Sequence, residues 1–216
     1  MAQRSDIFEN HYKDYCRQIA SVNFASVKDR LDIQIENNIA HIPFFNQTYQ
    51  VSGQGIFNRD NETANYITCV ILAKYILLCP DQLYLDGDWC TFRDFKRQAH
   101  FTNTNFFNAE TLGQIKTHFS GRLTDLKIAC KKMNGTALEI DLNYDLAIFF
   151  TALPRLSLLL LMNDADEQFP AECKVLFQRQ GEYYLDPESL AMTSGLLARK
   201  LIAADKSEEG ECNDNI

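Results

Sequence analysis

Hydrophobic runs long enough to cross a membrane are missing from this sequence. The two longest apolar stretches, 66–79 and 146–162, are interrupted by Lys74 and by Arg155, whereas a membrane helix needs roughly 18 to 20 uninterrupted apolar residues. The first nine residues are polar and charged and contain no apolar region, so we expect no secretory signal peptide. These absences predict a cytoplasmic protein without membrane association.

Closely spaced cysteines are also lacking. The chain has seven cysteines, and the nearest two, Cys69 and Cys79, are ten positions apart. Zinc and iron–sulfur sites use short spacings such as Cys-x-x-Cys, so the sequence predicts no metal site of this kind. The odd number and the scatter predict free thiols, which is typical of the cytosol.

Signatures of common enzymes are absent as well. The sequence has no Gly-x-Ser-x-Gly, no phosphate-binding glycine loop, no dinucleotide fingerprint and no His-Glu-x-x-His, and its four histidines show no ligand spacing. The net charge is −8 and the isoelectric point is about 5.0, and no nucleic-acid reader motif is present, so we expect no nucleic-acid partner. No cofactor is indicated.

What is present is the composition of a globular domain. Hydrophobic residues make up 46% of the 216 positions, and 15 Phe and 9 Tyr supply large side chains for a core, so the chain needs no disulfide or metal to fold. After Ala204 the sequence is polar and acidic. We therefore predict a single domain over 1–204 and a disordered acidic tail over 205–216.

The first part of the chain predicts a helix followed by a hairpin. Apolar residues at helical spacing indicate a helix over 7–27. Residues 31–36 alternate between apolar and polar, and with 39–45 they form a predicted hairpin around Asn37-Asn38. A short third strand over 49–51 and a loop over 52–60 follow. Asp60 is then expected to cap a core helix that Pro80 ends.

The second part predicts further helices and a group of strands. We expect helices over 109–119 and 123–133, alternation from 138 to 142, two buried strands over 146–151 and 156–162 bent at Pro154, and a strand over 174–178. Asp186 with Pro187 is a helix start. Together these elements predict an α+β fold, with an antiparallel or mixed sheet built from the early hairpin and the late strands and covered by helices.

Four segments resemble a known family. They are Trp89-Cys-Thr-Phe-Arg-Asp-Phe95, Ala152-Leu-Pro-Arg-Leu156, Asp166-Glu-Gln-Phe-Pro-Ala171 and Val175-Leu-Phe177. Together they are similar to the uncharacterised prokaryotic family called domain of unknown function 3786, from about the first hairpin to the last helix. The chain departs from the family pattern at Gln178, where an acidic residue is typical, and at Asn134-Gly135, where a double glycine is frequent.

This resemblance implies a small cytoplasmic protein of an anaerobic prokaryote, without an assigned activity. Some members resemble accessory proteins that carry iron–sulfur segments, but the cysteines that would hold such a cluster are missing here.

The acidic loop after the second buried strand is one candidate site. Asp164, Asp166 and Glu167 offer hard oxygen ligands of the type that Mg²⁺ or Ca²⁺ prefers. The glycine and glutamate that complete a calcium-hand loop are absent, and a solvated loop between strands explains the same residues.

Basic residues provide the second candidate. The segment 93–132 carries eight basic and three acidic residues, and such a surface suits an anion or an acidic partner, although exposed helix faces also explain it. Arg93 and Asp94 lie among aromatic residues, with His100 nearby in sequence. Arg155 lies in an apolar strand and must reach solvent, an anion, or a carboxylate, for which Asp94, Asp164 and Glu167 are the candidates.

Two functions follow from these candidates. The first is a noncatalytic accessory domain that binds a small anionic ligand, a cofactor or a protein partner. The second is an enzyme whose polar site contains Arg93, Asp94, His100 and the loop Asp164–Glu167. A concave pocket that unites these residues favours the enzyme, and a partly apolar surface favours the partner protein.

Overall fold

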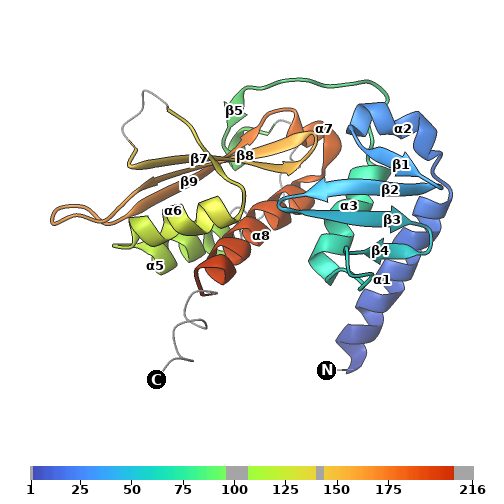
Figure 1. Ribbon diagram of the computed structural model, residues 1–216, viewed down its shortest axis with the longest axis horizontal. Coiled ribbons are helices and arrows are strands. Elements are labelled where there is room, and N and C mark those ends of the chain that lie inside the picture. Colours follow the sequence, from blue (N-terminus) through green and yellow to red (C-terminus); the bar gives the residue numbers. More distant parts are fainter. Residues whose placement is uncertain (1, 96–106, 140–143, 207–216) are drawn as a thin grey trace.

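The computed structural model describes residues 2–95, 107–139 and 144–206 (Figure 1). It contains two antiparallel sheets, one of four and one of five strands, together with helices. This architecture confirms the α+β class expected from the sequence.

The expected first helix is two helices. α1 spans Ala2–Ala20 and α2 spans Phe24–Leu31. They separate at Asn23, whose side-chain oxygen accepts a hydrogen bond from the amide of Ala25 (3.1 Å) and starts a new helix. The expected strand start at Leu31 is also wrong, because Leu31 ends α2 and Asp32 follows in the left-handed conformation.

The first sheet is a meander in the order β1-β2-β3-β4. Its strands are β1 Gln34–Glu36, β2 Ile39–Phe44, β3 Gln47–Ser52 and β4 Gly55–Phe57. The predicted Asn37-Asn38 turn is confirmed, with φ of 50° and 60° at the two residues, as a tight hairpin requires. β4 lies inside the segment predicted as a loop. The glycines of this segment suggested a loop, but a three-residue strand forms around the buried Ile56.

The central helix α3 spans Tyr66–Leu77. It begins at Asn65 rather than at Asp60, because the Asn65 side chain accepts a hydrogen bond from the amide of Thr68 (3.0 Å). The helix is apolar on nearly every side and packs against both α1 and α8, the last helix, which spans Pro187–Lys206. It therefore belongs to the core.

The second sheet has the order β5-β9-β8-β7-β6. Its strands are β5 Trp89–Cys90, β6 Thr136–Ala137, β7 Leu146–Leu153, β8 Leu156–Asn163 and β9 Glu172–Gln178. Leu153 pairs with Leu156, so Pro154 and Arg155 form the turn of a hairpin. The two buried strands were predicted correctly, but Arg155 lies in the turn and not within a strand.

Helices cover one face of this second sheet. They are η2 Asn108–Gly113, a π-helix, with α5 Gln114–Phe119, α6 Leu123–Lys132 and α8 Pro187–Lys206; α5, α6 and α8 lie beneath the strands in Figure 1. Two shorter elements are η1 Phe92–Asp94 and α7 Gly181–Tyr184. The predicted cap of α8 is confirmed, because Asp186 accepts a hydrogen bond from the amide of Ser189 (2.8 Å).

One cluster of buried side chains contains members of both sheets. The amide of Phe45, after β2, also donates a hydrogen bond to the carbonyl of Ala152 in β7 (2.8 Å). Within the described residues, no helix combines the length and the apolar character that a bilayer span requires.

The boundary of the predicted tail needs correction. α8 continues to Lys206, and Asp205 pairs with His118 (2.7 Å) and Arg122 (3.1 Å). Asp205 therefore belongs to the folded part of the chain.

Candidate functional site

β8 is apolar on both of its faces. Leu158, Leu160 and Met162 point to the helices and belong to the main buried cluster. Leu159 and Leu161 alternate with them and are only 3% and 2% exposed, yet they lie outside that cluster. The sheet therefore carries a second apolar layer on the face opposite α5, α6 and α8.

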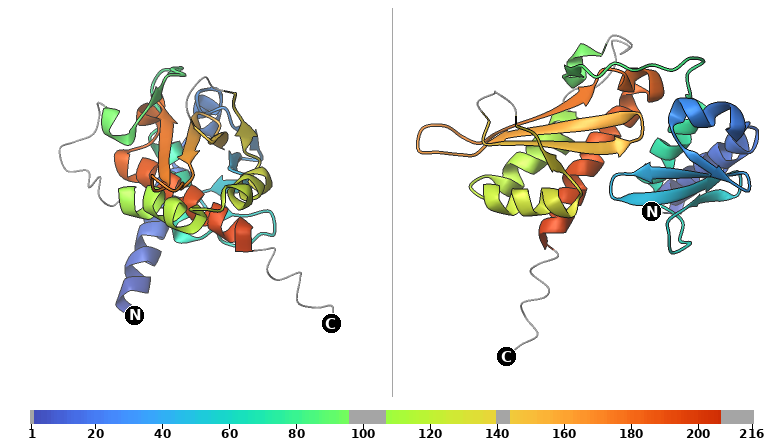
Figure 2. Two further views of the ribbon diagram at one scale, coloured as in Figure 1. Left: turned by 90° about the vertical axis from the view of Figure 1, so that its left-hand side faces the viewer. Right: turned by 45° about the horizontal axis from the view of Figure 1, so that its top comes forward.

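Neighbouring strands bury this second layer from the sides. Leu159 lies between Phe149 of β7 and Leu176 of β9, and Leu161 lies between Ala147 and Lys174. Trp89 of β5 meets Phe149 edge-on, with ring centroids 6.1 Å apart. We call this surface the outer face; its members are Trp89, Ala147, Phe149, Leu159, Leu161 and Leu176. In the right view of Figure 2, the strands lie in front of the helices that cover the other face.

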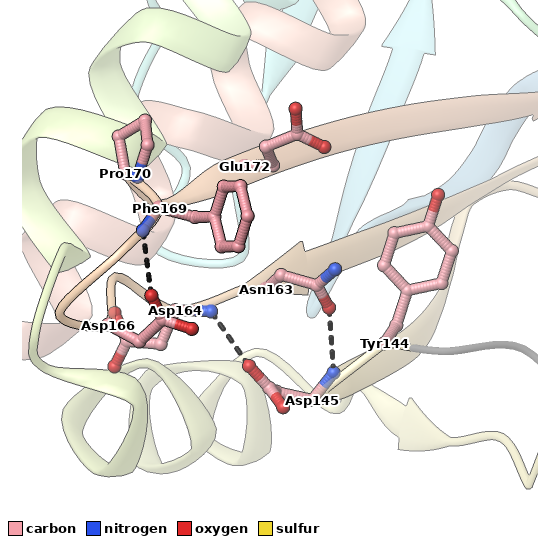
Figure 3. A pocket seen from close by; sticks show the side chains of 8 residues that line it. All are labelled: Tyr144, Asp145, Asn163, Asp164, Asp166, Phe169, Pro170 and Glu172. Carbon is pink, nitrogen blue, oxygen red and sulfur yellow. Dashed lines mark hydrogen bonds between the residues drawn. The ribbon is translucent and has the colours of Figure 1, made fainter.

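A pocket of about 730 Å³ opens at one end of the outer face. We call it the acidic pocket; its lining residues, shown in Figure 3, are Tyr144, Asp145, Asn163, Asp164, Asp166, Phe169, Pro170 and Glu172. By the two-residue period of a strand, Asn163 and Glu172 continue the outward rows of β8 and β9. The pocket is thus continuous with the outer face.

Hydrogen bonds to the backbone fix the shape of the acidic pocket. Asp145 accepts from the amide of Asp164 (2.8 Å), and its own amide donates to the side chain of Asn163 (3.0 Å). Asp166 accepts from the amide of Phe169 (2.7 Å) and so closes the β8–β9 loop (Figure 3).

Asp164 holds the start of α6. Its carboxylate accepts hydrogen bonds from the amides of Gly121 (2.6 Å), Leu123 (3.3 Å) and Ala165 (2.8 Å). Arg122, at the cap position of α6, provides no side-chain cap of its own. An aspartate from a distant loop therefore caps this helix, which gives Asp164 a structural role.

The charge of the pocket is strongly negative. Four carboxylates line it, and the ammonium of Lys174 donates a hydrogen bond to the hydroxyl of Tyr144 (3.0 Å). That hydrogen bond raises the pKa of Lys174. Phe169 is 66% exposed at the edge of the pocket. Among the described residues, no group of three or more His, Cys, Asp or Glu is arranged to hold a metal ion.

The sequence-predicted candidates do not form one site. Asp164 and Asp166 line the acidic pocket, while Glu167 is exposed in the same loop. Arg93 and Asp94 follow β5, which pairs with the far end of β9. The length of β9 corresponds to roughly 20 Å at 3.3 Å per residue. His100 lies outside the described residues.

Asp94 forms hydrogen bonds within its own turn. Its carboxylate accepts hydrogen bonds from the hydroxyl (2.7 Å) and the amide (2.8 Å) of Thr91. Both hydrogen bonds lower the pKa of Asp94, and the one from the hydroxyl has the larger effect. Arg93 and Asp94 are both exposed, whereas the neighbouring Phe92 is buried in the core.

Arg155 also forms hydrogen bonds with the backbone. Its guanidinium donates to the carbonyls of Arg30 and Asp29, each at 2.9 Å, and lies 3.7 Å from the carboxylate of Asp32. The three acids proposed from the sequence as its partners are therefore wrong. The real partners lie at the end of α2, about 125 positions earlier, where no sequence pattern could have indicated them.

The sequence analysis did not predict the outer face or several of the pocket residues. Tyr144, Asp145, Phe169 and Glu172 carry no motif. The available signal was β8 itself, which is apolar at every position from Leu158 to Met162, since such a strand needs cover on both faces.

Comparisons with known proteins place this chain in a family. A search of curated proteins and a search of solved structures found no match. A family model matches residues 23–200 of the 216-residue chain, which includes both sheets, the outer face and the acidic pocket. The chain therefore belongs to the family described as a domain of unknown function, DUF3786.

Proposed function

We propose that this chain is a noncatalytic accessory domain that binds a protein partner on its outer face. The observation that carries the proposal is the second apolar layer around Leu159 and Leu161, on the side opposite the covering helices. Leu159 and Leu161 are buried, while Trp89, Phe149 and Leu176 around them are partly exposed. An apolar sheet face gains stability when another element covers it, and a partly apolar surface is typical of a protein interface.

The polar candidates support a binding role over catalysis. Asp94, Asp164 and Arg155 each hold backbone groups, so their hydrogen-bonding capacity is committed to the fold. Arg93 and the acidic loop lie at opposite ends of β9, too far apart to act on one reacting atom. A small anionic ligand would meet four carboxylates in the acidic pocket and is not favoured there.

Site-specific crosslinking tests this function. A photoreactive benzoylphenylalanine is placed at Phe149 or at Leu176 and irradiated in the producing cells. The matched control carries the same group at Ile128, which is 39% exposed on α6, on the side of the sheet that the helices cover. We expect a crosslinked polypeptide of one defined mass at the two outer-face positions and none at Ile128. Equal adducts at all three positions, or none, would contradict the proposal.

A further inference from the structure

We infer that the partner segment is an amphipathic helix whose apolar side covers the outer face and whose basic end reaches the acidic pocket. This inference rests on the proposed function and adds the chemical class of the partner. Its first support is the continuity of the two surfaces, because Asn163 and Glu172 line the pocket and also continue the outward rows of β8 and β9.

The negative charge of the acidic pocket favours a partner segment with a basic end. Asp145, Asp166 and Glu172 are exposed around the pocket, and Asp164 is half-buried. Lys174 is the cation on this part of β9, and it is hydrogen-bonded to Tyr144. An acidic segment would be repelled by these carboxylates, whereas lysine or arginine side chains complement them and fix the orientation of the partner.

Phe169 adds an aromatic surface for the same cations. Its side chain is 66% exposed beside Pro170 at the edge of the pocket. An arginine or lysine placed over such a ring is attracted to its face. The pocket thus offers carboxylates and an aromatic ring to the same basic group.

The shape of the outer face favours a helix over a strand. A strand added at either edge, beside β5 or β6, would extend the sheet without covering its outer face. Its other face is already covered by helices, the usual cover of such a sheet. The distance from the Trp89 end to Glu172, roughly 20 Å, corresponds to about 13 helical residues.

The only tryptophan of the chain permits a direct test. Trp89 lies on the outer face at the end distant from the pocket, so its fluorescence reports on cover of the apolar surface. The probes are two synthetic amphipathic helices without tryptophan or tyrosine, identical except for a terminal block of lysines or of glutamates. Each is titrated into the full-length protein. We expect a saturable change in Trp89 emission with the lysine peptide and about tenfold weaker binding of the glutamate peptide.

Two variants test how the pocket carboxylates and the apolar surface each contribute to peptide binding. Asp145→Asn combined with Glu172→Gln should remove the difference between the peptides, and Leu176→Lys should abolish binding of both. Ile128→Lys, on α6, is the control that should change neither, and each variant's thermal midpoint verifies folding. Equal affinity for both peptides, or no response to the lysine peptide up to millimolar concentration, would overturn this inference.

The two proposals can fail separately. A specific crosslink at Phe149 together with a preference for the glutamate peptide rejects the basic helix but supports a binding face. A crosslinked species of twice the chain mass identifies a second copy as the partner and also rejects it. The absence of both crosslink and peptide binding rejects both proposals.

Discussion

The hydroxyl of Tyr75 accepts a hydrogen bond from the backbone amide of Arg155 at 3.2 Å. The same hydroxyl donates to the carbonyl of Leu31 at 2.7 Å, and the residue is fully buried. Burial raises the pKa of Tyr75, so it remains a neutral donor. One side chain of α3 therefore joins the end of α2 to the turn between β7 and β8.

Tyr75→Phe removes both hydrogen bonds and leaves buried backbone groups without partners. We expect a loss of about 1 to 3 kcal/mol in the free energy of unfolding, measured by urea denaturation with an unchanged m-value. The control is Tyr144→Phe, whose hydroxyl contacts the exposed Lys174 and which should cost less than about 0.5 kcal/mol. Equal effects of the two variants would disprove the structural role of the Tyr75 hydroxyl.

Arg155 supports the same junction from the other side. Arg155→Met removes the donors to the carbonyls of Asp29 and Arg30 and should cost about 1 to 2 kcal/mol. Asp32→Asn should cost less than about 0.5 kcal/mol, because Asp32 is exposed and 3.7 Å away. Arg155→Lys should recover only part of the loss, since an ammonium cannot reproduce the planar fork.

The urea denaturation midpoints of Arg155→Met, Arg155→Lys and Asp32→Asn test this order of stability losses. A loss for Asp32→Asn as large as that for Arg155→Met would show that the ion pair, and not the carbonyl contacts, carries the stability.

Local signals made much of the fold predictable. The Asn37-Asn38 turn and the Asp186 cap were correct because each depends on the conformational preference of one or two residues. The buried strands β7 and β8 were found because runs of apolar residues have few alternatives to burial. Asn23 was overlooked, although it follows the same capping rule, because the apolar spacing on both sides of it suggested one continuous helix.

Long-range pairings could not be predicted. The contacts of Arg155 with α2 and of Asp164 with α6 join positions that only the finished topology brings together. The acidic pocket has the same origin, since Asp145 directly precedes β7 and Glu172 begins β9. Its acidic loop was visible in the sequence, but its role in capping α6 was not.

Asp205 makes the end of α8 sensitive to pH. Although partial burial raises its pKa, hydrogen bonds from His118 and Arg122 lower it below the ordinary value overall. The charged form of Asp205 therefore stabilises the fold. This contribution is complete above the unfolded-state pKa of about 3.9 and is lost as the pH falls through the lower folded-state pKa.

Two truncations test the corrected boundary of the tail. Removal of 207–216 should leave the thermal midpoint unchanged at neutral pH. Removal of 205–216 should cost about 1 kcal/mol, or roughly 2 to 4 °C, and Asp205→Asn in the full chain should reproduce that loss. Identical midpoints for the two truncated proteins would show that the ion pairs of Asp205 contribute no stability.

The three buried cysteines, Cys69, Cys90 and Cys130, are expected to be unreactive. Burial raises the pKa of Cys69 and Cys130 to about 12 and that of Cys90 to about 11. At pH 8 a thiol of pKa about 12 is a thiolate about a thousandfold less often than an ordinary cysteine. Alkylation of Cys69 and Cys130 in the native protein should therefore be slowed by about a thousandfold, and that of Cys90 by about a hundredfold. Leu85→Cys supplies an exposed thiol as the internal standard.

In denaturant without reductant, all seven cysteines should be alkylated, since the six described ones are free. Two cysteines that resist modification together would reveal a disulfide and contradict this prediction. The comparison is made by intact-protein mass spectrometry.

Asp164 provides the last test, because it lines the acidic pocket and also caps α6. Asp164→Ala leaves the amides of Gly121 and Leu123 without their acceptor and should cost about 1 to 2 kcal/mol, as the loss of a helix cap does. Asp164→Asn retains one acceptor oxygen and should cost less. Glu172→Ala, at an exposed position of the same pocket, is the matched control and should change stability by no more than about 0.5 kcal/mol.

Amide hydrogen exchange separates the structural role of Asp164 from a binding role. In Asp164→Ala the first turn of α6 should exchange faster, while β8 remains protected. The Phe149 crosslink should persist wherever the protein is folded. If Asp164→Ala were as stable as the native chain and had lost that crosslink, Asp164 would be a contact for the partner rather than the cap of α6.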